Sequence, residues 1–269
     1  IVVILGDRYE TLAFAICAKF FNCKIIHLHG GETTKGSLDD IWRDVITKIS
    51  DYHFTSLEKY KKKVIQICGK TNTVFNFGSI GAFNIKHLKN IKVFKDKKFK
   101  KKILVSYHSS TMSISQSRND FLELLIALSK LKEHLILFTY PGHDLDSNFI
   151  IDRMKRFKKL NKNCTLIKEA TKFNYGDLLH NFDILVGNSS SGIIEAPSAN
   201  IATINIGDRQ KGRIAGPSVY NVKGDNKNIY KMIKKVLKNK KIIFKNPYYK
   251  KNILIKMCDK ISYICNLNS

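Results

Sequence analysis

In this 269-residue sequence, charged and histidine side chains come directly after apolar segments. If these segments are strands, such side chains lie together at one edge of the sheet. A glycine turn with Asp7 and Arg8 follows the opening β-branched run, and His29 and Glu32 follow the next apolar segment. In an open parallel sheet, ligands bind beyond the carboxyl ends of the strands. Carboxylates, histidine and arginine gathered there are suited to general acid–base catalysis and to stabilising a leaving anion.

A third charged group opens a predicted helix over residues 38–49. Asp39 and Arg43 are four residues apart, so they are expected to share one face of that helix. If Asp39 or Asp40 only caps the helix, Arg43 is its ion-pair partner, and for each residue by itself both interpretations stay open. Charged groups follow three successive apolar segments, and this repetition favours a functional role for them.

In the second half of the chain, residues 186–195 (VGNSSSGIIE) join an apolar run to a predicted helix through small hydroxyl residues. Free backbone N–H groups and the helix dipole at this junction predict a diphosphate-binding site, with Asn188, Ser189 and Ser190 as its residues. A serine-capped helix explains the serines but not the glycines on both sides. Glu195, one turn into the helix, is placed to accept hydrogen bonds from ribose hydroxyls.

Two basic groups complete this predicted site. His108 follows an apolar segment over residues 103–106, and Arg209 and Arg213 lie in a GDRQKGR loop after the apolar segment 201–206. Guanidinium groups match phosphate oxygens in geometry and charge. A lone histidine usually has a structural role, and a basic loop usually lies at the surface without a specific ligand. Because both follow strands at the same sheet edge as the serine loop, together they predict a nucleoside diphosphate site.

Strand-like and helix-like segments alternate along the chain in two series, separated by a lysine run at residues 95–102. Strict alternation predicts parallel sheets with helices on both faces, so we expect an α/β fold of two Rossmann-like domains. We assign residues 1–92 to the first domain. Residues 93–269 form the second, nucleotide-binding domain, which ends with a C-terminal helix. The chain opens directly on a buried-type strand, which predicts that the first domain is incomplete.

The composition limits the function classes. The formal charge is +25, but nearly all of it is lysine, with little aromatic interleaving and no recognition motif, so we predict no specific nucleic-acid partner. The six cysteines lack metal-ligand spacing, and neither disulfides, a metal nor a cofactor is expected. No apolar run approaches the roughly 20 residues of a membrane span, and no leader is recognisable. We therefore predict a cytoplasmic protein without a membrane partner.

Five segments closely resemble, in order and through nearly the whole chain, the hydrolysing UDP-N-acetylglucosamine 2-epimerases of sialic-acid and legionaminic-acid biosynthesis. They are GDRYE (6–10), HLHGGE (27–32), DDIWRDVITKIS (39–50), GNSSSGIIEAPS (187–198) and INIGDRQKGR (204–213). The resemblance implies a GT-B-like fold in which two domains face each other across a cleft that holds a UDP-sugar. It also implies that the family's first strand and phosphate-contacting loop precede Ile1, so that this chain is N-terminally truncated.

The resemblance further implies a reaction. The proton at sugar carbon 2 is removed while UDP leaves, and water adds to the resulting glycal, which releases free N-acetylmannosamine and UDP. Asp7, His29 and Asp39 are then candidates for acid–base and water-positioning work, with Arg43 orienting Asp39. The substrate-binding candidates are Arg8, Glu32, His108, Asn188, Ser189, Ser190, Glu195 and Arg209.

Ser109 follows His108 where the family usually has proline. The substrate is expected to be UDP-N-acetylglucosamine or UDP-diacetylbacillosamine, and the resemblance suggests a homo-oligomer, either a dimer or a tetramer. Three alternatives stay open: a non-hydrolysing 2-epimerase, a GT-B glycosyltransferase, and a basic binding protein without catalysis. The GDRYE and GDRQKGR motifs favour hydrolysis.

Overall fold

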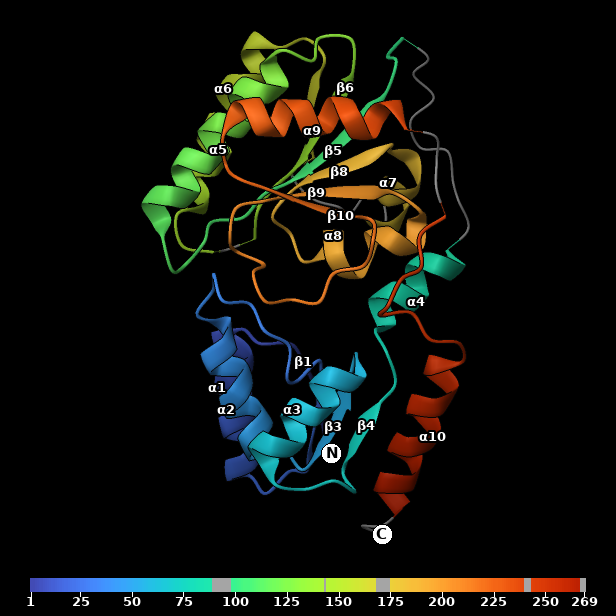
Figure 1. Ribbon diagram of the computed structural model, residues 1–269. Coiled ribbons are helices and arrows are strands. Elements are labelled where there is room, and N and C mark those ends of the chain that lie inside the picture. The colour runs from blue at the N-terminus through green and yellow to red at the C-terminus, as the bar shows by residue number, and fades with distance from the viewer. Residues whose placement is uncertain (89–97, 143, 168–174, 240–242, 267–269) are drawn as a thin grey trace. The chain divides into compact units, whose positions relative to one another are not determined.

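The computed structural model describes residues 1–88, 98–142, 144–167, 175–239 and 243–266 (Figure 1). The chain divides into two compact units, and each is described by itself. Unit 1 comprises Ile1–Phe83 with Pro247–Ser269, and unit 2 comprises Asn84–Asn246. Each unit is built on a parallel sheet flanked by helices, which confirms the predicted α/β fold with two parallel sheets.

Unit 1 contains a four-stranded parallel sheet in the order β1-β2-β3-β4. The strands are short, and β2 and β3 are mostly buried, as expected for strands covered by crossover helices. In the edge strand β1, by contrast, Val3 and Leu5 are exposed, although the continuous apolar run predicted a strand buried on both faces. The strands are β1 (Val2–Leu5), β2 (Ile25–Leu28), β3 (Tyr52–Thr55) and β4 (Val74–Asn76), and the helices are α1 (Tyr9–Phe20), α2 (Asp39–Ile49), α3 (Glu58–Cys68), α10 (Ile253–Asn266) and the start of α4 (Ile80–His87).

The two faces of the first sheet pack against different helices. Ile25 belongs to a core cluster that includes residues of α1 and α2, such as Ala15 and Ile46. Its neighbour Ile26 belongs to another cluster, which includes Ile253 of α10. Successive side chains of a strand point to opposite faces, so β2 is buried on both sides.

The C-terminal segment belongs to unit 1, which differs from the predicted second domain over residues 93–269. Buried residues of α10, including Met257, pack against Phe54 on the first sheet. The segment before it is tied down as well, because the carbonyl oxygen of Tyr248 accepts from the backbone N–H of Ser79 at 2.9 Å. An amphipathic helix packs wherever its apolar face is best buried, whatever its position in the sequence. The predicted boundary at 92/93 lies outside the described residues.

Unit 2 contains a six-stranded parallel sheet in the order β10-β9-β8-β5-β6-β7. The order reverses between β5 and β8, which are neighbours although two strands separate them along the chain. The strands are β5 (Lys102–Ser106), β6 (Leu135–Thr139), β7 (Cys164–Ile167), β8 (Ile184–Gly187), β9 (Ala202–Ile206) and β10 (Val219–Val222), and the helices are α5 (Ile114–Ser129), α6 (Ser147–Leu160), α7 (Tyr175–Asn181), α8 (Ser191–Ile194), the 3-10 helix η2 (Ala196–Ala199) and α9 (Asn226–Lys238).

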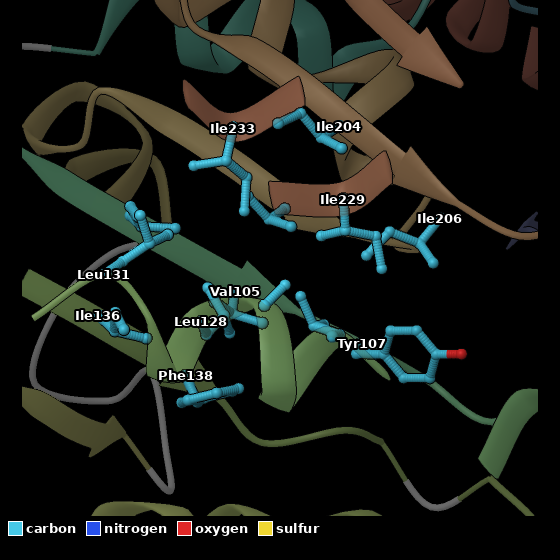
Figure 2. Close-up of a cluster of buried hydrophobic side chains, with 14 of the residues drawn as sticks. Val105, Tyr107, Leu128, Leu131, Ile136, Phe138, Ile204, Ile206, Ile229 and Ile233 are labelled. Atoms are coloured by element: carbon cyan, nitrogen blue, oxygen red, sulfur yellow. The ribbon is translucent and has the colours of Figure 1, made fainter. Parts of the chain in front are cut away.

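The larger core of unit 2 lies between one face of this sheet and helices α5, α6 and α9. Figure 2 shows Val105 and Ile204 of the strands beside Leu128 of α5 and Ile229 of α9. A second cluster covers the opposite face with residues of α7, including Leu179. Burial on both faces holds the carboxyl ends of β5 and β8 in place, which is where ligands bind in such sheets.

Three elements differ from the predictions. The sequence predicts one helix over residues 190–199 after the serine loop, but the structure splits it into α8 and η2, because Pro197 lacks the N–H that a continuous helix would need there. Helix α4 and strand β10 were not predicted. The sequence also predicts a strand over residues 165–168 and a helix over residues 173–181. Residue 168 of this strand and residues 173 and 174 of this helix lie outside the described residues, as do residues 95–97 of the lysine run.

Within the described part of the chain, every helix is too short or too polar to cross a bilayer.

Candidate functional site

Arg43 lies at the centre of the charged residues of unit 1. Its side chain is fully buried, and its guanidinium forms ion pairs with Asp7 and Asp40. It also donates to the carbonyl oxygen of Glu32 at 2.6 Å. Burial by itself would lower the pKa of Arg43, but the surrounding carboxylates, with Asp7 the strongest, raise it above its ordinary value. Arg43 therefore stays charged and orients two carboxylates from separate segments.

Asp40, and not Asp39, is the helical partner of Arg43. Asp40 Oδ1 accepts from both the backbone N–H and the hydroxyl of Thr34 at 2.7 Å. Asp39 Oδ2 instead accepts from Ser37 Oγ at 2.6 Å. The prediction that Arg43 orients Asp39 is therefore wrong, because Asp39 is the first residue of α2 and its carboxylate bonds to the preceding loop.

His29 is held by Glu32. The ring Nδ1 of His29 lies 2.7 Å from Glu32 Oε1, and Ser56 Oγ donates to the same oxygen at 2.6 Å. Glu32 is buried, and its carboxylate engages Nδ1 of His29. A contact of Glu32 or His29 with a substrate stays a prediction.

Arg8 forms an exposed pair with Glu10. Its Nε and a terminal N–H donate to the two Glu10 carboxylate oxygens at 3.1 and 3.0 Å. This interaction lowers the pKa of Glu10. The role of Arg8 at the nucleotide stays a prediction.

Asn188 joins the ends of the two strands at the reversal of order in unit 2. Its Oδ1 accepts from the backbone N–H of His108 at 2.7 Å, and its Nδ2 donates to the His108 carbonyl oxygen at 2.8 Å. Gly187, just before it, has a φ of +144°, and a β carbon there would lie 1.9 Å from the Ser106 carbonyl oxygen. These contacts place His108 and the serine loop side by side.

A cavity of about 300 Å³ lies at the carboxyl ends of β5, β6 and β8. Doubly wound sheets bind their ligands at the point where the strand order reverses, and this cavity lies there. Its walls combine hydroxyl groups, aromatic side chains and one histidine. The lining residues are Ser106, His108, Thr139, Tyr140, Ile167, Tyr175, Ser189 and Ser191.

The serine loop differs in detail from the prediction. Ser189 and Ser191 line the cavity, whereas Ser190 is not among the lining residues. The first N–H groups of α8 are also engaged within the loop, since Gly192 donates to the Ser189 carbonyl oxygen at 3.2 Å and Ile193 donates to that of Ser190 at 3.0 Å. Hydroxyl groups therefore face the cavity where free backbone N–H groups were expected.

Tyr175 links the serine loop to Glu195. The Tyr175 hydroxyl lies 2.5 Å from Ser191 Oγ, and burial together with the nearby Glu195 carboxylate raises the pKa of Tyr175. Arg209 reaches the same region, where a terminal N–H donates to the Asn188 carbonyl oxygen at 3.2 Å. Arg209 thus contacts Asn188, and Glu195 lies near Tyr175, but none of the three is among the residues that line the cavity. Their joint role at a nucleotide stays a prediction.

Sequence reasoning missed several lining residues. Ser106 and Thr139 are the last residues of β5 and β6, so the rule of polar strand ends was sufficient to find them. Tyr175 lies away from the matched motifs, and nothing in its sequence context marks it. Among the described residues, no group of three histidine, cysteine or acidic side chains is arranged to hold a metal ion.

Two parallel α/β sheets of this kind place the chain in the GT-B-like structural class. It is similar to the Staphylococcus aureus MnaA-UDP co-structure, with a TM-score of 0.78, 14% identity and coverage of 99% of this chain and 76% of that chain. It is also similar to the UDP-GlcNAc 2-epimerase of Methanocaldococcus jannaschii in complex with UDP-GlcNAc and UDP, with a TM-score of 0.75, 18% identity and coverage of 97% and 75%. At these identities the likeness shows the fold.

The chain belongs to the UDP-N-acetylglucosamine 2-epimerase family, which it matches over residues 1–262. It is 42% identical to the polysialic acid biosynthesis protein P7 of Escherichia coli, over 94% of this chain and 67% of that protein. It is 36% identical to the GDP/UDP-N,N'-diacetylbacillosamine 2-epimerase (hydrolyzing) of Campylobacter jejuni, over 79% of this chain and 57% of that protein. The membership predicted from the five motifs is confirmed. The chain thus spans 67% of the length of the Escherichia coli relative and 57% of the length of the Campylobacter jejuni relative.

Proposed function

We propose that this protein is a hydrolysing 2-epimerase that converts a UDP-linked acetamido sugar to its free 2-epimer and UDP. The observation that carries the proposal is the buried Arg43 cluster with Asp7 and Asp40, close in the chain to the His29–Glu32 pair. The names of relatives support it, since those from Campylobacter jejuni and Legionella pneumophila are both described as hydrolyzing 2-epimerases.

The reaction needs a base, a stabilised leaving group and a water molecule. The base takes the proton from sugar carbon 2 while the bond between carbon 1 and the UDP oxygen breaks, so UDP leaves with the electron pair and a glycal forms. Water then adds its oxygen to carbon 1, and a proton returns to carbon 2 from the opposite face. Removing a proton from an unactivated carbon requires a positioned base, which the carboxylates and histidine of unit 1 provide.

In unit 1 we assign the acid–base and water-positioning roles to Asp7, His29 and Asp39, with Arg43 as the residue that holds Asp7 in place. The ion pair between Arg43 and Asp7 keeps this carboxylate oriented within a largely buried cluster. His29 presents Nε2, because Glu32 engages its other nitrogen.

In unit 2 we assign UDP binding to the cavity at the ends of β5, β6 and β8. Its hydroxyl groups from Ser189 and Ser191 can donate to phosphate oxygens, and the nearby cation of Arg209 balances their charge. Glu195 accepts from the ribose hydroxyls in this assignment, and His108 binds the diphosphate. A site that holds the departing UDP by charge lowers the barrier to elimination.

We propose UDP-N-acetylglucosamine, which would yield N-acetylmannosamine, or UDP-diacetylbacillosamine as the substrate. We further propose that the protein acts in the cytoplasm as a homo-oligomer, either a dimer or a tetramer, in the synthesis of a bacterial surface polysaccharide. The name of the Escherichia coli relative supports this pathway class.

The test is product analysis, with the 269-residue chain and with the full natural chain that contains it. Each protein is incubated with UDP-N-acetylglucosamine and, separately, with UDP-diacetylbacillosamine in ¹⁸O-labelled water and in D₂O. Hydrolysing epimerisation is expected to yield UDP and a free 2-epimer with ¹⁸O at carbon 1 in the first solvent and deuterium at carbon 2 in the second.

The alternatives give other products. A non-hydrolysing enzyme yields an epimerised sugar still linked to UDP, and a glycosyltransferase yields a product only when an acceptor is added. Free sugar without deuterium at carbon 2 indicates simple hydrolysis. Any of these results overturns the proposal.

A further inference from the structure

Unit 2 contains a second cavity, with a volume of about 440 Å³. It lies at the carboxyl ends of β9 and β10, beside the first half of α5. Its walls consist of two carboxylates, two amides, one lysine, two glycines and one valine. Within the described part of the chain, this cavity shares no lining residue with the one assigned to UDP. It is therefore a separate place at which a ligand can bind.

Asp120 of α5 is the buried acid of this cavity. Only 6% of the residue is exposed, and its Oδ1 accepts from Gln116 Nε2 at 2.7 Å. Among the described residues, Oδ2 has no hydrogen-bond partner and Asp120 has no cationic partner. Burial raises the pKa of Asp120, and the Asp208 carboxylate adds to this rise, whereas the hydrogen bond from Gln116 opposes it. A buried carboxylate is costly without a cation, so the cavity lacks one positive charge.

Two glycines make room for this carboxylate. A β carbon on Gly207 would lie 2.5 Å from Asp120 Oδ2, and one on Gly224 would lie 2.0 Å from Asp120 Oδ1. The three residues come from α5 and from the segments after β9 and β10, so separate parts of the chain meet at one acid. An apolar side chain in place of Asp120 would fill this space without burying a charge. Space filling by itself therefore does not explain an acid here.

The rest of the wall offers mainly oxygen atoms to a ligand. Gln116 uses its amide N–H on Asp120, which leaves Oε1 as its acceptor. Asp208 adds a second carboxylate, with 81% of its side chain exposed. Val222 is the one apolar side chain among the described lining residues, and none of them is aromatic. Such a wall suits a hydrophilic ligand that donates hydrogen bonds.

Lys223 is the competing cation inside the protein. Its side chain is exposed and lines the same cavity, but it forms no ion pair with Asp120 in the described part of the chain. A flexible lysine stem can reach several positions. A test of the site must therefore remove Lys223 as well as Asp120.

An ammonium group fits this cavity better than a metal ion. A single ion fills little of 440 Å³, and the described residues provide no group of three histidine, cysteine or acidic side chains around one point. A primary ammonium has three N–H donors, which carboxylate and amide oxygens satisfy through charge-assisted hydrogen bonds. The oxygens of Asp120, Gln116 and Asp208 are of these kinds. The remaining space suits hydroxyl groups attached to the amine.

We propose that this cavity binds a small primary amine that carries hydroxyl groups, as amino sugars do, with its ammonium group held by Asp120. The protein then binds a second kind of molecule besides the UDP-sugar. The inference does not depend on the proposed UDP site, because the two cavities have different lining residues.

The experiment is a calorimetric titration of the full natural chain that contains these residues. It is made at pH 7, where the amines used are mostly protonated, in a buffer without primary amines. Glucosamine and glucose are the matched probes, since they differ only by an ammonium or a hydroxyl group at carbon 2. We expect glucosamine to bind at a single site, with or without saturating UDP, and glucose to bind at least about tenfold more weakly.

Asp120→Asn keeps the size of the side chain and an acceptor for Gln116, but removes the charge. It should bind glucosamine at least about tenfold more weakly than wild type, with a melting temperature at or above the wild-type value because an unpaired buried charge is gone. Glu123→Gln is the matched control on the same helix, since Glu123 accepts from Asn226 and does not line the cavity. Glu123→Gln should bind glucosamine like wild type, and Lys223→Met should bind it at least as tightly.

Several outcomes would overturn the inference. One is that neither glucosamine nor ethanolamine, a smaller hydroxylated amine, binds the wild-type protein. Another is that Asp120→Asn binds glucosamine like wild type, or that saturating UDP abolishes the binding. If only Lys223→Met binds glucosamine, Lys223 neutralises Asp120 in the native protein. If Ca²⁺ or Mg²⁺ binds more tightly than glucosamine and depends on Asp120, the cavity is a metal site and the amine assignment is wrong.

Discussion

Gly187 at the end of β8 packs against Ser106 of β5 so closely that a β carbon would lie 1.9 Å from the Ser106 carbonyl oxygen. Gly187→Ala should therefore lose about 3 kcal/mol or more of unfolding free energy, because two paired strands must move apart. Gly69→Ala is the control, since Gly69 also has positive φ but a β carbon there would meet nothing within 4 Å, and it should lose about 1 kcal/mol. Chemical denaturation compares the two, and equal losses would contradict the steric argument.

Removing the Asn188 amide should weaken UDP binding. Asn188→Ala takes away both hydrogen bonds to the His108 backbone, so we expect about a tenfold lower affinity by calorimetry. Asn205→Ala is the control: it also loses a buried amide hydrogen bond, from Asn205 Nδ2 to Asn221, but away from the cavity. If both variants bind UDP like wild type, the amide of Asn188 does not organise the site.

Arg43 should be important for stability as well as activity. Arg43→Met leaves the carboxylates of Asp7 and Asp40 without their cation in a largely buried cluster, and a loss of about 3 to 5 kcal/mol is expected. Arg8→Met breaks an exposed pair with Glu10 and should leave the denaturation midpoint nearly unchanged. A small effect of Arg43→Met would mean that the cluster relaxes and takes up water.

Substitutions of Asp39 and Asp40 should differ in their effects on activity and on stability. Asp40→Asn weakens the pairing with Arg43 and Thr34, so it should lower both kcat and the unfolding free energy, the latter by about 2 kcal/mol. Asp39→Asn keeps an acceptor oxygen for Ser37 Oγ and should lower kcat at least about a hundredfold with little change in stability. If Asp39→Asn keeps wild-type kcat, Asp39 has no acid–base role and Asp40 is the better candidate.

The buried pair His27 and His53 should make the fold acid-sensitive. Burial lowers the pKa of His27 to about 4 and that of His53 to about 3, below the ordinary value of 6.5. The unfolded chain therefore takes up protons that the folded chain does not, and stability falls as pH drops from about 6.5 toward 4, by up to about 1.4 kcal/mol per pH unit for each histidine.

His53→Phe tests this sign. Among the described residues, neither ring nitrogen of His53 has a hydrogen-bond partner, so an apolar ring is expected to be tolerated, and the stability of the variant should fall less steeply between pH 6.5 and 4. Unfolding free energies measured at several pH values check this. A slope equal to that of wild type would mean that His53 is protonated in the folded state.

Much of the fold was predictable because it depends on local patterns. Continuous apolar runs predicted the strands, and the strand-end rule placed both Asp7 and Arg43 among the charged residues at the ligand-binding edge. The partner predicted for Arg43 was Asp39, whereas the structure pairs Arg43 with Asp7, 36 residues away. Strand β10 was missed because the residues of Val219–Val222 are only partly buried or exposed, without the apolar run that marks the others. Tyr175 was missed because it lies on a separate helix, outside the matched motifs.

The sequence by itself determined the alternation of strands and helices, the family, and most of the polar residues at the strand ends, because these depend on residue type and on spacing within a few positions. Only the tertiary structure decided that Arg43 pairs with Asp40, that β5 lies beside β8, that Asp144 reaches His108, and that α10 packs on the first sheet. These choices depend on which apolar faces are buried against each other and which charges lose water together. Such partners are mostly far apart in the chain, so their spacing carries no record of the contact.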